Sequence, residues 1–273
     1  MRVNQIITLT LLAIVITLVL FPIYWMTTTS FKLPTDYITR SLKWIPPRIT
    51  FSHYQNLWEH KFSRYFLNTL VISLFSTLLA AVTGSLAAYS LVRFKFPAKF
   101  GQLFLLWALI VKMVPPIVIA IPLYVILRRM GLINTRLGLI ITYQIYALPY
   151  CIWMMLGFFR DLPVELEEAA ATDGASRMKI LQAIVLPLVA PGLVAAGIFS
   201  LIMTWNEFIY ALLYLRSPDV FTLPIHVANY ITEYETLWGE LCAAGILSSL
   251  PVLVFSVYVQ KYLIRGFTMG GLK

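Results

Sequence analysis

Two charged residues interrupt long apolar stretches of the sequence. Lys112 falls within the stretch Gly101–Leu127, and Glu207 falls within Leu188–Leu215. An ionisable side chain inside a membrane-spanning helix costs about 3 kcal/mol on insertion scales, so it needs a partner or a function. At about 1.5 Å per residue, Lys112 lies roughly 16 Å along a helix from Gly101, near the middle of a bilayer. Both residues are therefore candidates for a polar pathway across a membrane.

The residues beside these two charges favour the same interpretation. Two prolines follow Lys112 and are predicted to break or kink its helix, as transport pathways often require. Lys112 either pairs with a carboxylate, extends into a wet cavity or lines the path of a solute. Glu207 either makes structural hydrogen bonds or contacts the solute, and its pairing with Lys112 is left open. The candidate pathway residues are Lys112, Pro115, Pro116, Trp205, Asn206 and Glu207.

The sequence contains no motif for catalysis or for a bound cofactor. No G-x-x-x-x-G-K-[ST] segment occurs, so no phosphate-binding loop is expected. The histidines, His53, His60 and His226, form neither an HExxH motif nor a cluster with cysteine, and no metal site is predicted. Cys151 and Cys242 lie in apolar stretches and are interpreted as small buried residues, not as a disulfide pair. No catalytic residue is predicted.

The polar segment 160–187 has the pattern of a helical hairpin exposed to water. Asp161 is predicted to cap its first helix, Pro163 suits the first turn, and three glutamates favour the positive end of that helix. Gly174 is a stop signal, and Pro187 marks the entry to the next apolar stretch. The Glu-Ala-Ala face of the first helix is small and uncrowded. We therefore expect another protein surface to dock on it.

The elements that position these residues are predicted to be membrane helices. The chain is 60% hydrophobic and only 12% charged, whereas about 25% charged residues are usual in a soluble domain. The net charge of +9 comes from short basic clusters between apolar stretches, which favours loops at anionic headgroups over nucleic-acid binding. Six stretches reach about 20 residues, the length needed to span a bilayer. They are Ile6–Met26, Phe66–Val92, Gly101–Leu127, Leu137–Phe159, Leu188–Leu215 and Leu241–Val259.

Several features organise these stretches into an all-α membrane bundle. The first stretch is too long for a signal peptide and lacks a small-residue cleavage site, so we expect it to be retained. Ala80, Gly84 and Ala88 recur every four residues and predict a close helix-packing face. The aromatic and basic run FSHYQNLWEHKFSRYF predicts an interfacial helix before the second span. Lys and Arg divide ten against ten between the two sides, so charge does not settle the orientation.

Several runs of the sequence resemble permease subunits of ABC importers. In the hairpin, Glu168-Ala169-Ala170, Asp173-Gly174-Ala175 and Ile184-x-Leu186-Pro187 resemble the EAA signature of that family in residue type and spacing. The runs AAYSLVRFKFP, IPLYVILRRMGLINTRLGLI, TWNEFIYALLYL and LPVLVFSVYVQKYLIRGFTMGGLK extend the resemblance over nearly the whole chain. They are similar to the six-span, maltose-type carbohydrate permeases. Lys112 departs from the pattern, because the family's usual residue there is uncharged.

The resemblance implies a type I ABC importer transmembrane domain in a prokaryotic cytoplasmic (inner) membrane, with both termini in the cytoplasm. The implied partners are a second homologous permease, two ATP-binding subunits, an extracytoplasmic solute-binding protein and membrane lipid, with no nucleic acid. ATP and Mg would be bound and ATP hydrolysed by the partner subunits, not by this chain. The residues implied in coupling to the ATPase are Glu168, Ala169, Ala170, Asp173, Gly174, Ala175, Ile184, Leu186 and Pro187.

The function implied by the resemblance is half of the translocation pathway for a sugar or oligosaccharide. Closure of the ATP-binding subunits would move the hairpin and switch the permease pair between inward-open and outward-open states. One alternative is the same importer type for an anionic solute, such as a phosphorylated polyol or acidic sugar, which Lys112 motivates. Another is an ion-coupled secondary transporter, which would predict repeat symmetry between halves.

The predicted domain organisation has three parts. Residues 1–65 hold the first membrane helix and an external, interfacial segment. Residues 66–264 form the five-helix transmembrane core, with a cytoplasmic coupling loop at 160–187, and residues 265–273 form a cytoplasmic tail.

Overall fold

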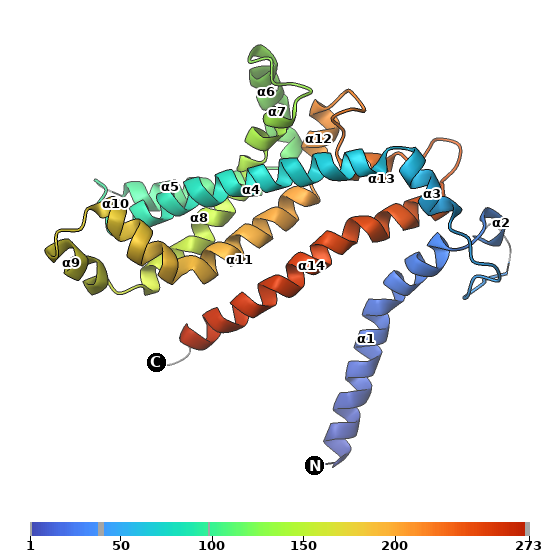
Figure 1. Ribbon diagram of the computed structural model, residues 1–273, viewed down its shortest axis with the longest axis horizontal. Coiled ribbons are helices and arrows are strands. Elements are labelled where there is room, and N and C mark those ends of the chain that lie inside the picture. The colour runs from blue at the N-terminus through green and yellow to red at the C-terminus, as the bar shows by residue number, and fades with distance from the viewer. Residues whose placement is uncertain (1, 38–40, 98, 271–273) are drawn as a thin grey trace. The chain divides into compact units, whose positions relative to one another are not determined.

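The computed structural model describes residues 2–37, 41–97 and 99–270, although not the side chains of residues 2–4, 259 and 261–270. Helices joined by turns make up this part of the chain, with one isolated bridge between Ile231 and Thr236 (Figure 1). The predicted all-α fold is confirmed. The helices are α1 (Arg2–Ser30), α2 (Pro34–Tyr37), α3 (Ser52–Glu59), α4 (Phe62–Arg93), α5 (Phe100–Met113), α6 (Pro116–Arg129), α7 (Arg136–Thr142), α8 (Gln144–Asp161), α9 (Glu165–Thr172), α10 (Arg177–Ile180), the π-turn Leu181–Val185, α11 (Leu186–Trp205), α12 (Ile209–Tyr214), α13 (Leu223–Ala228) and α14 (Trp238–Gly270).

The six predicted spans have counterparts in these helices. Four segments are long and apolar enough to cross a membrane alone, namely Gln5–Ser30, Phe62–Arg93, Arg177–Trp205 and Trp238–Tyr258. The other two are bent pairs, with 102° between α5 and α6 and 41° between α7 and α8. Counting each bent pair as one span gives six, as the sequence predicts. The bend between α7 and α8 was not predicted.

Contacts divide the chain into two compact units. The first comprises Met1–Phe66 and Leu223–Leu250, and the second comprises Leu67–Thr222 and Pro251–Lys273. The predicted domain limits at residues 65 and 264 stay predictions. The backbone of α14 continues through residues 265–270 of the predicted tail, and residues 271–273 lie outside the described residues.

A buried polar cluster holds the first unit together. The imidazole of His53 on α3 donates through Nε2 to the Lys32 carbonyl at 2.8 Å, and its Nδ1 lies 3.1 Å from Oε1 of Glu240 at the start of α14. Asn56 donates to the same Glu240 oxygen at 3.1 Å. Gly239 makes this approach possible, because a Cβ there would lie 2.2 Å from the imidazole ring. The nearby Glu240 carboxylate raises the pKa of His53 and outweighs the opposing effect of burial.

A helix is present where the sequence predicts an interfacial one, but it is separate from the second span. It corresponds to α3, which ends at Glu59, and α4 begins at Phe62. Lys61 between them has a φ of 62°, a left-handed conformation that breaks the helix. A second histidine, His226, stacks on Tyr65 with ring centroids 4.2 Å apart, and burial lowers its pKa to about 4. These histidines therefore pack and hydrogen-bond within the first unit.

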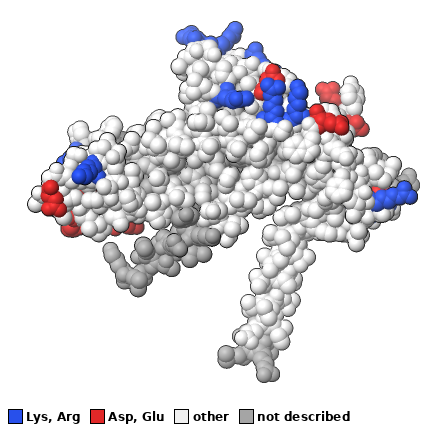
Figure 2. Space-filling view, in the orientation of Figure 1, with Lys and Arg blue, Asp and Glu red and all other residues white. Residues whose placement is uncertain are grey.

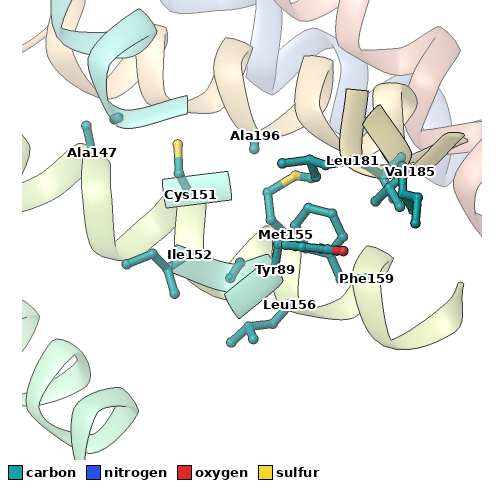
Figure 3. Packing of buried hydrophobic residues seen from close by; sticks show 14 residues of the cluster. Tyr89, Ala147, Cys151, Ile152, Met155, Leu156, Phe159, Leu181, Val185 and Ala196 are labelled. Carbon is teal, nitrogen blue, oxygen red and sulfur yellow. The ribbon is translucent and has the colours of Figure 1, made fainter. Parts of the chain in front are cut away.

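The core of the second unit lies where α4, α8 and α11 meet. Tyr89, Cys151, Met155 and Phe159 belong to one buried cluster with residues of α10, the π-turn and α11 (Figure 3). The predicted small-residue face of α4 packs into this region. Ala80 and Ala88 are fully buried, and a Cβ on Gly84 would lie 2.8 Å from the Cys151 Cβ. Both cysteines are buried and free, as predicted.

This close approach gives a testable prediction for Gly84. Replacing Gly84 with leucine should force α4 and α8 apart and destabilise the protein by about 1–3 kcal/mol, the usual cost of overpacking a helix interface. Gly157→Leu is the matched control, because that exposed glycine on α8 has open space around its Cβ position. Thermal unfolding of both variants in detergent would measure the difference. Equal unfolding temperatures for the two variants would contradict the packing interpretation.

Charged side chains are unevenly distributed over the second unit. On the visible face, the surface along the middle of α4 is uncharged, whereas charged side chains gather over α9 and α10, over α6 and near α12 (Figure 2). An uncharged surface along a long helix is typical of a segment that faces lipid.

Candidate coupling and pathway sites

The predicted hairpin is present between α8 and α11. Helix α9 ends at Thr172, and Gly174 follows with a φ of 84°, the left-handed conformation that glycine adopts most easily. The Ser176 hydroxyl then accepts from the Lys179 amide at 3.4 Å and caps α10. A π-turn at Leu181–Val185 leads from α10 into α11 just before Pro187, which has no amide hydrogen to donate into that turn.

One predicted detail of the hairpin is wrong. Asp161 does not cap α9, because it is the last residue of α8, and Val164 precedes α9 with no side-chain cap. The reason lies in Pro163, which favours an extended conformation at the preceding residue. Leu162 is extended, with φ −81° and ψ 120°, and therefore separates Asp161 from the start of α9.

The predicted coupling residues divide between two faces of the hairpin. The exposed ones are Glu168, Ala169, Asp173, Gly174 and Pro187. The half-buried ones are Ala170, Ala175, Ile184 and Leu186. Of these, Ala170, Ala175 and Leu186 pack against the core cluster of the second unit. The exposed residues are accessible to another protein, whereas Ala170, Ala175 and Leu186 attach the hairpin to the bundle.

Sequence reasoning missed one polar contact of the hairpin. Glu167 lies on the packed side of α9, and its carboxylate accepts from the Arg93 guanidinium at 2.6 Å and from the Tyr89 hydroxyl at 2.7 Å. The glutamate and its partners are more than 70 residues apart in the sequence, and no local pattern connects them. The available signal was that Arg93 and Glu167 carry opposite charges and follow apolar stretches of the sequence. Many other pairs of basic and acidic residues in the chain fit that description equally well.

Lys112 lies in the last turn of α5, immediately before the break in the third span. Met113 ends the helix, and Val114 and Pro115 are both extended, with ψ values of 128° and 135°. Pro116 then starts α6, which lies at 102° to α5. The predicted break at the prolines is confirmed. It is a sharp change of direction, because two successive residues leave the helical conformation.

The ammonium group of Lys112 rests on an aromatic side chain. Its Nζ lies 5.3 Å from the centroid of the Tyr150 ring on α8, within the range of a cation–π interaction. The Tyr150 ring in turn lies 6.0 Å from the Phe199 ring on α11. Lys112 is exposed on the surface of the chain, and within its described part no carboxylate forms an ion pair with it.

Glu207 has a different role from Lys112 and is not its partner. The prediction of one helix from Leu188 to Leu215 is wrong, because α11 ends at Trp205 and α12 begins at Ile209. The buried Glu207 carboxylate accepts from the backbone amides of Tyr210 at 2.8 Å and of Ala211 at 3.2 Å. It therefore satisfies amides that the first turn of α12 leaves without an intrahelical partner, which explains why the chain starts a new helix there.

The two residues before Glu207, Trp205 and Asn206, differ in their exposure to solvent. Trp205 is buried, with 2% of its surface exposed, and contributes to packing. Asn206 is exposed and donates to the Ile202 carbonyl at 2.8 Å. Of the six predicted pathway residues, Lys112, Pro115 and Pro116 lie at the break between α5 and α6, whereas Trp205, Asn206 and Glu207 lie where α11 ends and before α12 begins. Their assignment to a pathway stays a prediction.

The family model and the similar proteins all describe membrane components of transport systems. The family model described as "Binding-protein-dependent transport system inner membrane component" matches residues 80–269. The trehalose transport system permease protein SugB of Mycobacterium tuberculosis is 35% identical over 93% of this chain and 92% of its own length. The diacetylchitobiose uptake system permease protein DasC of Streptomyces coelicolor is 32% identical, over 93% of this chain and 91% of that protein.

Solved structures show the same fold. A chain of a bacterial ABC transporter for import of the acidic polysaccharide alginate superimposes with a TM-score of 0.80 at 23% identity, covering 96% of both chains. A chain of the MetNI methionine ABC transporter gives a TM-score of 0.57 at 20% identity, over 75% of this chain and 94% of that one. The chain therefore belongs to the family of inner membrane components of binding-protein-dependent transport systems, and it is a transport subunit, not an enzyme with an ATPase site of its own.

Proposed function

We propose that this chain forms half of the translocation pathway of an ATP-driven importer for a sugar or oligosaccharide. The observation that carries the proposal is the match over 93% of the chain to permeases named for trehalose and diacetylchitobiose. In this proposal a solute-binding protein delivers the sugar, and two ATP-binding subunits supply energy and hold ATP and Mg. A second, homologous permease completes the pathway. An ion-coupled secondary transporter is not retained, because the chain belongs to a binding-protein-dependent family.

The hairpin of α9 and α10 determines the proposed orientation. An exposed face of small and acidic residues at Glu168, Ala169 and Asp173 is a suitable surface for an ATP-binding subunit. That subunit works in the cytoplasm, so the hairpin would lie on the cytoplasmic side of the inner membrane. With six spans, both termini then lie on that side as well.

An anionic solute is a second candidate, favoured by the position of Lys112. Its ammonium group is exposed and held against Tyr150, beside a break in the helix that carries it. An exposed ammonium group can bind the carboxylate of an acidic sugar through a charge-assisted hydrogen bond. The two candidates differ only in the charge of the solute.

Purification of the native complex tests the proposed function. The complex should contain this chain, a second and non-identical permease, and two ATP-binding chains. After reconstitution into vesicles, its ATP hydrolysis should rise when the cognate binding protein is added with a bound sugar, and the sugar should accumulate. A fully active homodimer of this chain would contradict the heteromeric assembly. Uptake driven by an ion gradient without ATP would contradict the importer itself.

A further inference from the structure

Glu167 differs from the other glutamates of α9 in facing the bundle. Glu165 and Glu168 are exposed, whereas 11% of the Glu167 side chain is exposed. Both of its carboxylate oxygens are engaged, Oε1 by Nε of Arg93 at 2.6 Å and Oε2 by the Tyr89 hydroxyl at 2.7 Å. Charge-assisted hydrogen bonds of this length are about twice as strong as neutral ones. Partial burial protects them from screening by salt.

Arg93 joins three elements of the second unit. It is the last residue of α4, and only 9% of its side chain is exposed. Besides its bond to Glu167 it donates at 2.8 Å to the carbonyl of Leu162, the residue that connects α8 to α9. One guanidinium therefore fixes both the first turn of α9 and the connection through which α9 would pivot.

Tyr89 connects the same contact to the hydrophobic core. It lies one helical turn before Arg93 on α4, and its ring packs edge-on against Phe159 of α8 with centroids 5.6 Å apart. Figure 3 shows Tyr89 beside Phe159 and Met155 in the buried cluster. The carboxylate of Glu167 is thus bonded to two residues of α4 that are themselves immobilised, one by packing and one by a second hydrogen bond.

The rest of the hairpin offers α9 few other attachments. The helix has eight residues, too few to be stable alone in water. It is followed by the left-handed residue Gly174 and, after α10, by the π-turn Leu181–Val185. Its packed apolar residues are small, with Ala170 and Ala175 contacting the core cluster. Arg177 of α10 also lies over the Phe94 ring just after α4, 5.4 Å from its centroid. The hydrogen bonds that join α9 itself to α4 are those of Glu167, so they offer a direct route for a force applied to the exposed face of α9.

We propose that Glu167, held by Tyr89 and Arg93, is the positioning residue that transmits movement of the α9 hairpin to α4 and the helix bundle. The proposal rests on the proposed function, in which the exposed face of α9 binds an ATP-binding subunit. Glu167 does not itself contact that subunit. It keeps the hairpin rigidly attached, so that closure of the ATP-binding subunits turns the bundle and not the hairpin alone.

Substitution of Glu167 by glutamine tests this role. Glutamine keeps the size of the side chain but removes the charge, and Tyr89→Phe removes only the hydroxyl donor. In the reconstituted complex, E167Q should assemble and hydrolyse ATP, yet the amount of sugar transported per ATP hydrolysed should fall at least about tenfold. Tyr89→Phe should cause a smaller loss. The double variant should lose less than the sum of the two, because the residues act as one unit.

Glu165→Gln is the matched control, since it removes the charge of an exposed glutamate in the same helix. It should keep the wild-type ratio of transport to ATP hydrolysis. The proposal is overturned if E167Q keeps that ratio too, or if E167Q loses the ATP-binding subunits on purification, because Glu167 would then serve only folding or docking. Failure of the wild-type complex to transport any sugar would count against the proposed function instead.

Discussion

Replacing Ala169 with tryptophan should abolish solute uptake while the permease remains folded in the membrane. Ala169 is exposed on α9, whereas Glu167 and Ala170 are half-buried against the bundle. Because Ala169 is exposed, a large side chain there should leave the stability of the chain nearly unchanged. In the proposed complex it would occupy the space that the ATP-binding subunit needs. Copurification of that subunit and uptake should both fall to background.

Ala169 gives a cleaner test than Gly174, although both belong to the predicted coupling residues. Gly174 has a φ of 84°, and any other L-residue there adds backbone strain of about 1–2 kcal/mol whatever its size. A Gly174 variant would therefore confuse a misfolded turn with a blocked surface. Ala183→Trp is the matched control, because Ala183 is also exposed but lies in the π-turn after α10. Wild-type copurification and uptake in Ala169→Trp would show that α9 is not the docking surface.

The parts of the structure that sequence reasoning predicted are those encoded over short distances. The α9–α10 hairpin is marked by Gly174 and by proline at either end, and the packing face of α4 is marked by small residues at a four-residue interval. The break after Lys112 is marked by two adjacent prolines, which together remove two helical hydrogen bonds and favour an extended backbone at the residue before each. In each case a local property of the backbone or of side-chain size decides the outcome.

The features that the sequence did not predict are of two kinds. One depends on contacts between segments that are distant in the sequence, and the other on a choice between a continuous and a broken helix. The partners of Glu167 are Tyr89 and Arg93 on α4, which lie 78 and 74 residues away in the sequence. Glu207 stands in an apolar stretch long enough for one helix, and it instead caps α12 through the amides of Tyr210 and Ala211. The break frees two backbone amides to bond the buried carboxylate, so the break is favoured.

Replacing Lys112 with methionine should distinguish the two candidate solutes. Methionine keeps the length and apolar stem of lysine but removes its charge, and no buried carboxylate is left unpaired because Lys112 forms no ion pair in the described part of the chain. The loss of stability should therefore stay within about 1 kcal/mol, the value of an exposed cation–π contact with Tyr150. This is well below the 3–5 kcal/mol expected for breaking a buried ion pair.

The effect on transport depends on the charge of the solute. Losing a hydrogen bond to a charged group costs about 1.5–3 kcal/mol, so the apparent affinity for an anionic sugar should fall roughly 10- to 100-fold in Lys112→Met. The affinity for a neutral sugar should fall less than that for the anionic sugar, since a neutral hydroxyl loses a bond to one charged group and not an ion pair. The measurement is the solute dependence of transport in vesicles, with an oligosaccharide of uronic acids and a neutral disaccharide as the two solutes.

Two variants serve as controls for Lys112→Met. Lys112→Arg should keep most of the affinity, and Lys95→Met, at an exposed lysine after α4, should leave transport of both solutes unchanged. If Lys112→Met changes neither melting temperature nor transport of either solute, Lys112 only extends into water, and its assignment to the pathway is wrong.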